Sequence, residues 1–210
     1  MPLAAVIAET APFLAAATQR DPSIARFAEL LAEVEPAPAQ SAAAAPLPVC
    51  RCWLAALERP AAGVERLCAE LAELTPRLSW TQNPNYLRSP PTPAFLDNYG
   101  YAVLAGPADG PPALARHDQL AFGVLLLGPH THYPLHHHPA AEVYIPLNGA
   151  EWWRGDGPWR EQPPGAVIHH PPNLPHATRA GDAPLLALYL WHGEIATHAK
   201  LTGNSSPLRG

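Results

Sequence analysis

Hydrophobic residues recur at helical spacing in the first third of the chain. Asp21-Pro22-Ser23 is a typical helix start, because Asp caps free backbone amides and Pro fits the first helical position. The apolar residues that follow lie three or four positions apart and form one stripe: Ile24, Phe27, Leu30, Leu31 and Val34. A second helical block covers about residues 50–74, with an interruption at 60–63. These helices are short, so we expect them to pack against the part of the chain that follows.

After residue 79 the pattern changes from helical to extended. Residues 79–114 are proline-rich and loop-like, with one candidate strand at 100–104. Further on, apolar runs bounded by turn residues predict strands at 120–127, 142–147, 166–169 and 184–191, and a hairpin around Gly155-Asp156-Gly157-Pro158. The run 184–191 is almost continuously apolar, which is typical of a strand buried on both faces. Short strands at this spacing predict a mainly β sandwich or barrel.

The pattern therefore divides the chain into three parts. We expect a helical extension over residues 1–78 that packs on a β-barrel over 79–201, and a frayed tail over 202–210.

Composition and charge exclude several classes of protein. A hydrophobic content of 48% and a charged content of 15% are those of a globular chain. The net charge is −5 and the 13 Lys and Arg are scattered singly, which argues against nucleic acid as a partner. No apolar run reaches the ~20 residues that span a bilayer, so we expect no membrane partner. The three cysteines are an odd number without a second close pair, which indicates free thiols. With no basic lead-in of a signal peptide at the N-terminus, we expect a cytoplasmic protein.

One stretch, residues 133–144, concentrates side chains that can bind a metal ion. Read as a single strand, its even positions place His136, His138, Glu142 and Tyr144 on one face, and turn His137 away. These polar groups would be costly to bury without a partner, and a divalent metal ion satisfies all of their lone pairs. A further ligand is available at His176, which we expect to come from a turn across the barrel.

Other histidines near this stretch are expected at the pocket rim or surface, and none of them is assigned to the metal: His130, His132, His137, His169 and His170. The ligand types do not select among Zn, Fe, Mn, Co and Ni, because sites with nitrogen and oxygen ligands bind many divalent ions.

Two spaced motifs resemble those of the cupin family. In the first, His136, His138, Glu142 and Gly149 match His-x-His, three residues, Glu, six residues, Gly. In the second, Gly165, Pro171 and His176 match the pattern, whereas Asn173 replaces a Gly and Ala180 replaces the trailing Asn. Asn tolerates the left-handed backbone that Gly supplies at such a position. The resemblance implies a jelly-roll β-barrel that holds a metal ion in its mouth.

With Tyr133 and Tyr144 included, the pattern resembles the cupin-type dimethylsulfoniopropionate (DMSP) lyases, in particular their Q-type branch, which also carry helices before the barrel. The resemblance implies a β-elimination that releases dimethyl sulfide and acrylate. It implies that Tyr144 is the catalytic base, and that Tyr133 is its neighbour in the substrate pocket. The implied metal ligands are His138, Glu142, Tyr144 and His176, with His136 beside them.

A sulfonium cation is well matched by aromatic faces. Such faces are offered by Tyr133, Tyr189, Trp191, Trp152, Trp153 and Trp159, of which Trp191 is a plausible pocket wall and Tyr189 another candidate for contact with the substrate.

Two other functions are compatible with the same metal site. A cupin dioxygenase or isomerase using Fe(II) or Mn(II) also needs open metal positions, but does not need a tyrosine beside the glutamate. A non-enzymatic cupin that senses or stores a small ligand would usually carry a DNA-binding domain, and the first third has no basic recognition helix. Cupins often dimerise through strands and helical appendages, so the resemblance allows a homodimer.

Overall fold

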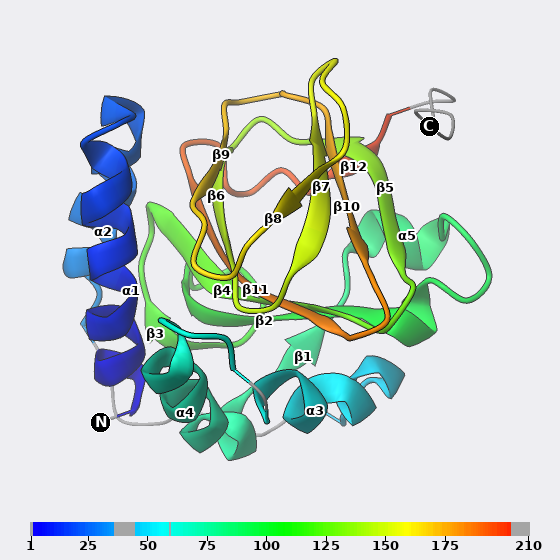
Figure 1. Cartoon of the computed structure of the whole chain (residues 1–210), viewed down its shortest axis with the longest axis horizontal. Helices are drawn as coiled ribbons and strands as arrows, with labels where there is room; N and C mark the ends of the chain where they lie inside the picture. Colours follow the sequence, from blue (N-terminus) through cyan, green and yellow to red (C-terminus); the bar gives the residue numbers. More distant parts are fainter. Residues whose placement is uncertain (1, 36–44, 59, 203–210) are drawn as a thin grey trace.

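The computed structural model describes residues 2–35, 45–58 and 60–202 (Figure 1). Helices precede the barrel strands, as the sequence predicts, and Asp21 caps η1 by accepting a hydrogen bond from the Ser23 amide at 3.0 Å. These first helices are α1 (Pro2–Thr18), η1 (Pro22–Ile24), α2 (Ala25–Ala32), η2 (Pro48–Cys52), α3 (Trp53–Leu57), α4 (Glu65–Glu73) and η3 (Thr75–Arg77).

Two sheets form the rest of the fold. The larger sheet is antiparallel apart from the parallel pair β2–β3 and runs in the order β1-β2-β4-β11-β6-β9, with β3 beside β2. Its strands are β1 (Trp80–Thr81), β2 (Tyr99–Gly106), β3 (Ala113–Arg116), β4 (Leu120–Leu127), β6 (Ala141–Pro146), β9 (Ile168–His170) and β11 (Leu185–His192). The smaller sheet runs β12-β5-β10-β7-β8, and its strands are β5 (His132–His137), β7 (Ala150–Arg154), β8 (Arg160–Gln162), β10 (His176–Ala180) and β12 (Lys200–Leu201). The predicted fold class, a mainly β fold of two largely antiparallel sheets behind a helical segment, is confirmed.

Strand β11 shows that the two faces of the larger sheet pack against two different apolar clusters. Leu186, Leu188 and Leu190 belong to the apolar cluster that the helices share, and α2 and α3 contact this strand. The alternate residues Ala187 and Tyr189 belong to a second cluster inside the barrel, together with residues of the smaller sheet. The continuous apolar pattern at 184–191 therefore has the predicted cause, because both faces of the strand are covered.

The loop prediction for residues 79–114 is wrong in part. Beside the expected strand β2, this stretch holds β1, β3, a short helix α5 (Pro84–Arg88) and η4 (Leu96–Asn98). Asn83 caps helix α5, and its side-chain amide also donates to the Ala199 carbonyl at 2.9 Å. So short an element depends on such distant partners, which periodicity cannot reveal.

The expectation of one strand through residues 133–144 is also wrong. The chain leaves the smaller sheet after His137 and enters the larger sheet at Ala141, so His136 and Glu142 lie in different sheets. The intervening turn has the same parity as a strand, and the side chains still converge. For this reason strand alternation predicted the correct neighbouring side chains, although the backbone that joins them is not a single strand.

Within the described ranges, no helix combines the length and apolar character needed to cross a bilayer. Cys50, Cys52 and Cys68 are free, as predicted. Apart from Thr202, the tail predicted to fray lies outside the described residues.

Candidate metal centre and adjoining pocket

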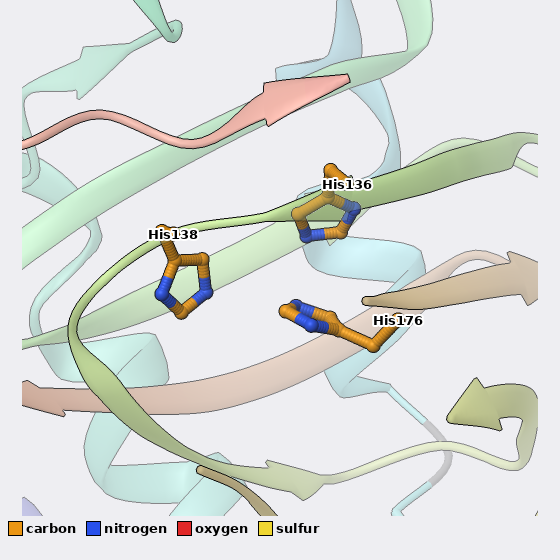
Figure 2. Close-up of side chains that lie close together, drawn as sticks. All are labelled: His136, His138 and His176. Atoms are coloured by element: carbon orange, nitrogen blue, oxygen red, sulfur yellow. The ribbon is translucent and has the colours of Figure 1, made fainter. Parts of the chain in front are cut away.

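Three buried histidines converge where the smaller sheet opens toward the larger one (Figure 2). His136 lies in β5, His138 follows that strand, and His176 is the first residue of β10. Strands β5 and β10 are neighbours and pair His176 with His136, so His176 comes from the adjacent strand and not, as expected, from a turn across the barrel. One ring nitrogen of each residue lies within 4.8 Å of the others. The three histidines together can hold a metal ion.

Backbone carbonyls fix the tautomer of each of these rings. The Nδ1 atoms of His136, His138 and His176 lie 2.8, 3.0 and 2.8 Å from the carbonyls of Pro134, Ala140 and Leu174. A carbonyl only accepts, so each Nδ1 must carry the hydrogen, and in the neutral ring each Nε2 presents a lone pair. This is the usual arrangement of metal-binding histidines, whose other nitrogen donates to an outer partner.

Glu142 completes the cluster from the larger sheet and is fully buried. Its Oε2 lies 3.2 Å from His138 Nε2 and 3.0 Å from His176 Nε2. His176 Nε2 makes no hydrogen bond within the described part of the chain, despite that short distance. Two nitrogen lone pairs that face a carboxylate oxygen repel it unless a cation lies between them, and one divalent ion would satisfy all three atoms. The donor set therefore fits a divalent metal ion.

The charge of Glu142 is already stabilised by its neighbours. Burial opposes ionisation, but an N–H or a positive charge on the adjacent imidazoles, His138 first and then His170 and His176, outweighs burial and holds the pKa of this carboxyl well below its ordinary value; a metal ion at the two Nε2 atoms would act in the same direction. The residue is therefore a carboxylate, the form in which it can bind a cation.

His170 contradicts the expectation that it lies at the rim or surface, because it is fully buried. Antiparallel pairing of β6 with β9 places it opposite Glu142, and its Nδ1 lies 3.1 Å from Glu142 Oε2. Its ring also stacks on His176, with centroids 4.0 Å apart. Burial, followed by the nearby His176, lowers its pKa to about 3, so the ring is neutral. Only the tertiary pairing reveals this contact. The one signal in the sequence was that residues 168 and 170 are two positions apart and so share a face of a short strand.

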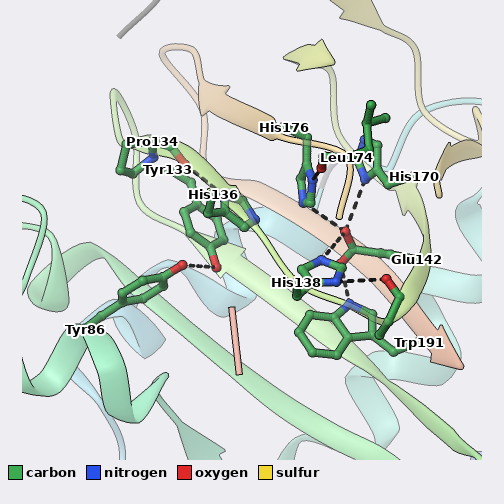
Figure 3. A network of polar contacts seen from close by, with 11 residues as sticks. Tyr86, Tyr133, Pro134, His136, His138, Glu142, His170, Leu174, His176 and Trp191 are labelled. Carbon is green, nitrogen blue, oxygen red and sulfur yellow. Dashed lines mark hydrogen bonds and ion pairs between the residues drawn. The ribbon is translucent and has the colours of Figure 1, made fainter. Parts of the chain in front are cut away.

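Trp191 contacts the same carboxylate from the opposite side (Figure 3). In β11 it pairs with Glu142 across the sheet, and its indole Nε1 donates to Glu142 Oε1. Its ring stacks on His138 with centroids 4.0 Å apart. Strands β11, β6 and β9 thus place Trp191, Glu142 and His170 in one row.

The two tyrosines singled out in the sequence are both buried beside this cluster. Burial, followed by the Glu142 charge, raises the pKa of Tyr144 well above its ordinary value. Tyr133 lies flat on His136, and its hydroxyl is 3.2 Å from the hydroxyl of Tyr86. Tyr86, in the unexpected helix α5, is a neighbour that no motif indicated.

A cavity of about 360 Å³ leads to the cluster. Tyr189 and Trp191 line it, together with Glu142 of the cluster and the exposed residue Asp109. Among the described residues, no Lys or Arg lines it. Its aromatic lining consists of Tyr99, Tyr101, Tyr133, Tyr144, Tyr189 and Trp191. The cavity thus offers ring faces and negative charge, which favour an organic cation.

Comparison with known proteins assigns the chain. A model of the dimethylsulfoniopropionate lyase family matches residues 18–187. The chain belongs to this family. It is 39% identical over 109 residues to the DMSP lyase DddQ of Ruegeria pomeroyi, a stretch that covers 51% of this chain and 52% of that protein. The aligned stretch therefore spans about half the length of this curated relative.

Solved structures extend the similarity of this family member to nearly the whole fold. The crystal structure of DddQ from Ruegeria pomeroyi matches with a TM-score of 0.71 and 26% identity, over 94% of this chain and 96% of that one. A chain from a crystallographic study of the DMSP lyases RdDddP and RnDddQII matches with a TM-score of 0.73 over 96% of this chain and 97% of that one. At 22% identity, that second match speaks for the fold alone.

Other histidines of this family member lie away from the cluster. His137 points out of it, as alternation predicts, and its Nδ1 lies 3.0 Å from the Thr202 hydroxyl. His169 contacts Asp21, the residue that caps η1, with 3.0 Å between His169 Nδ1 and the carboxylate. Of the adjacent tryptophans, Trp152 is buried beside Tyr144, and Trp153 is partly exposed.

Proposed function

We propose that this chain cleaves DMSP into dimethyl sulfide and acrylate by a base-catalysed β-elimination. The proposal is carried by the cavity, which joins an aromatic, cation-free lining to a cluster of three histidines and a glutamate. DMSP has a sulfonium at one end and a carboxylate at the other. The aromatic faces suit the sulfonium, whereas the carboxylate requires a positive charge that the described lining residues do not supply.

A single divalent metal ion would supply that charge. We propose His136, His138, Glu142 and His176 as its ligands, joined by Tyr144. When bound, the ion acts as a Lewis acid toward the substrate carboxylate and stabilises the negative charge that develops beside it. Zn, Fe, Mn, Co and Ni are all compatible with these nitrogen and oxygen ligands.

We propose Tyr144 as the catalytic base. Its phenolate oxygen would take the proton from the carbon next to the substrate carboxylate. The electrons of that bond form the double bond of acrylate, the carbon–sulfur bond breaks, and dimethyl sulfide leaves with its electron pair. The proton remains on Tyr144 until it passes to solvent.

The surroundings of Tyr144 explain why the reaction would depend on a metal ion. Burial and the Glu142 carboxylate both favour the neutral phenol, which is a poor base. A divalent cation in the cluster would offset both effects and favour the phenolate. Ionisation of the base is therefore tied to occupation of the site.

Tyr133, Tyr189 and Trp191 would hold the substrate, with Tyr133 close enough to His136 to act beside the metal site. The pKa of Tyr133 is raised well above its ordinary value, chiefly by burial, so its hydroxyl is a hydrogen-bond donor. We propose that it steadies the substrate and assists the catalytic step, while Tyr144 takes the proton.

The free cysteines support a reducing, cytoplasmic location for this activity. The homodimer stays a prediction.

The direct test is headspace gas chromatography of dimethyl sulfide after DMSP is added to the protein in the presence of each divalent ion. We expect release with at least one ion and none after chelation. Absence of dimethyl sulfide with all five ions, from a protein shown to bind them, would overturn the assigned reaction.

A further inference from the structure

His170 contacts the proposed metal site through two of its members at once. It approaches Glu142 Oε2 with Nδ1 at 3.1 Å, and its ring stacks on His176 at an interplanar angle of 15°. The residue has no exposed surface, and its position opposite Glu142 is fixed by the pairing of β6 with β9. A side chain held so firmly against two candidate ligands can affect both.

The orientation of His170 differs from that of the three histidines that converge on one point. Those rings turn Nδ1 to a backbone carbonyl and leave Nε2 for the cluster. His170 instead turns Nδ1 to the carboxylate, and its Nε2 has no hydrogen-bond partner in the described part of the chain. An ionised carboxylate only accepts, so the nitrogen that faces it must carry the hydrogen.

We propose that His170 is a positioning residue, which donates its Nδ1–H to Glu142 Oε2 and fixes that carboxylate for the metal ion. The inference rests on the metal site of the proposed function. In this arrangement Trp191 donates a hydrogen bond to Oε1 and His170 donates one to Oε2. The two bonds together restrain rotation of the carboxylate about the Cγ–Cδ bond. Each oxygen keeps a second lone pair, so Oε2 can still bind a cation.

The stack on His176 adds a second effect. His176 donates its Nδ1–H to the Leu174 carbonyl, and its ring face packs on the ring of His170. Removing the His170 ring would therefore free one carboxylate ligand and one imidazole ligand together. Outer partners of metal ligands typically change metal affinity by about 10- to 100-fold, and we expect His170 to fall in that range.

The test compares substitutions that keep or lose the donor. In His170→Asn the side-chain amide nitrogen takes the place of Nδ1, whereas in His170→Gln it takes the place of Nε2, and His170→Ala removes both. The full-length chain, freed of metal, is titrated with Co²⁺ against a competing chelator, without substrate. We expect Ala and Gln to weaken Co²⁺ binding by about 10- to 100-fold and Asn to restore most of the affinity.

His137→Ala is the matched control, because it removes a neighbouring histidine that points away from the cluster, and it should leave the affinity unchanged. Circular dichroism and urea midpoints confirm that each variant is folded. Unchanged affinity in a folded His170→Ala protein would overturn the proposal. So would Asn and Ala variants that weaken binding equally, with the same change in the visible spectrum of Co²⁺, since that result marks His170 as a ligand.

Metal binding and turnover are measured separately, so the two failures can be distinguished. A wild-type chain that binds no Co²⁺ overturns both the metal site and the role of His170. A wild-type chain that binds Co²⁺ but releases no dimethyl sulfide overturns the reaction alone, and the comparison of His170 variants still decides the proposal.

Discussion

The ring of Tyr133 lies flat on the imidazole of His136, with centroids 4.0 Å apart and planes within 6° of parallel. The Tyr133 hydroxyl in turn contacts the hydroxyl of Tyr86 at 3.2 Å. A candidate ligand is therefore linked through a stacked ring to helix α5, which lies outside the barrel sheets.

This hydrogen bond allows the roles of Tyr133 and Tyr86 to be distinguished by experiment. Tyr133→Phe and Tyr86→Phe remove the same hydrogen bond, but only Tyr133 lines the cavity. If the Tyr133 hydroxyl contacts the substrate, its removal should lower kcat/KM about tenfold, the equivalent of one hydrogen bond of ~1.4 kcal/mol. Tyr86→Phe should have a smaller effect in the same dimethyl sulfide assay. Equal losses would show that the hydroxyl pair acts only in packing.

Tyr144→Phe should abolish most turnover while the substrate still binds. A positioned base contributes about 10²- to 10⁴-fold, and kcat should fall by that amount. Tyr189→Phe is the comparison, because Tyr189 pairs with Tyr144 across β6 and β11 and loses the same atom; as a proposed substrate contact it should raise KM more than it lowers kcat. Steady-state kinetics measure turnover, and calorimetry measures the binding of DMSP to the metal-loaded protein. Retained turnover in Tyr144→Phe would exclude this residue as the base.

Removal of the metal ion should lower thermal stability as well as activity. An ion present at 100 times its dissociation constant stabilises the folded chain by about 2.7 kcal/mol, or ~5–10 °C in Tm for a chain of this size. Chelation should therefore lower Tm by that amount, and addition of Zn²⁺ or Mn²⁺ should restore it. His138→Ala should show no such response. If metal changes the Tm of the wild-type protein no more than it changes the Tm of His138→Ala, the proposed metal site is wrong.

The metal-free chain should lose stability as the pH falls below about 6.5. The folded-state pKa of His170 is about 3, whereas an unfolded histidine titrates near 6.5. The unfolded chain therefore binds the extra proton, and this contribution is complete above pH 6.5 and declines toward pH 3. Between pH 6.5 and 5 the loss through His170 should be about 2 kcal/mol, at ~1.36 kcal/mol per pH unit.

His136, whose pKa burial and His176 also lower, adds a loss in the same direction. Urea unfolding in the presence of a chelator measures the pH slope, and His170→Asn should make that slope shallower. Identical slopes in the two proteins would contradict the buried neutral state of His170.

The aromatic lining predicts a preference for substrates with an onium group. Tyr101 and Tyr189 stand edge to face, with centroids 6.1 Å apart, and both line the cavity. A cation over such rings gains about 0.5–2 kcal/mol, so Tyr101→Leu should raise KM for DMSP by roughly 2- to 30-fold. Inhibition by propionate, which has the carboxylate but no cation, should be much less affected. An equal change for both molecules would argue against contact between Tyr101 and the sulfonium.

Much of the site could be predicted from spacing, because motif residues in a barrel converge through regular pairing. His136, His138, Glu142 and His176 do lie together, and the turn before His176 contains Asn173 in the expected left-handed conformation, with φ of 62°. The backbone path between His138 and Glu142 could not be predicted, because the two residues are four positions apart, and this even separation preserves the alternation of a strand even across a turn.

The remaining contacts depend on tertiary pairing. His170 looked like its neighbour His169, since both are histidines before a proline pair, yet one faces the cluster and the other faces Asp21. Their roles separate only when β9 is paired with β6. Tyr86 was hidden for a similar reason, because its helix depends on side-chain bonds from Asn83 and Asn85 to the distant Ala199 carbonyl.

Strand β11 also limits how this protein can evolve. Its alternate residues belong to two different cores, one shared with the helices and one inside the barrel. Insertion or deletion of one residue would exchange the two sets, turning Trp191 toward the helices and Leu190 toward the cluster. New specificity can therefore arise here through substitution at Tyr189 and Trp191, whereas changes of length are confined to the loops around the cavity.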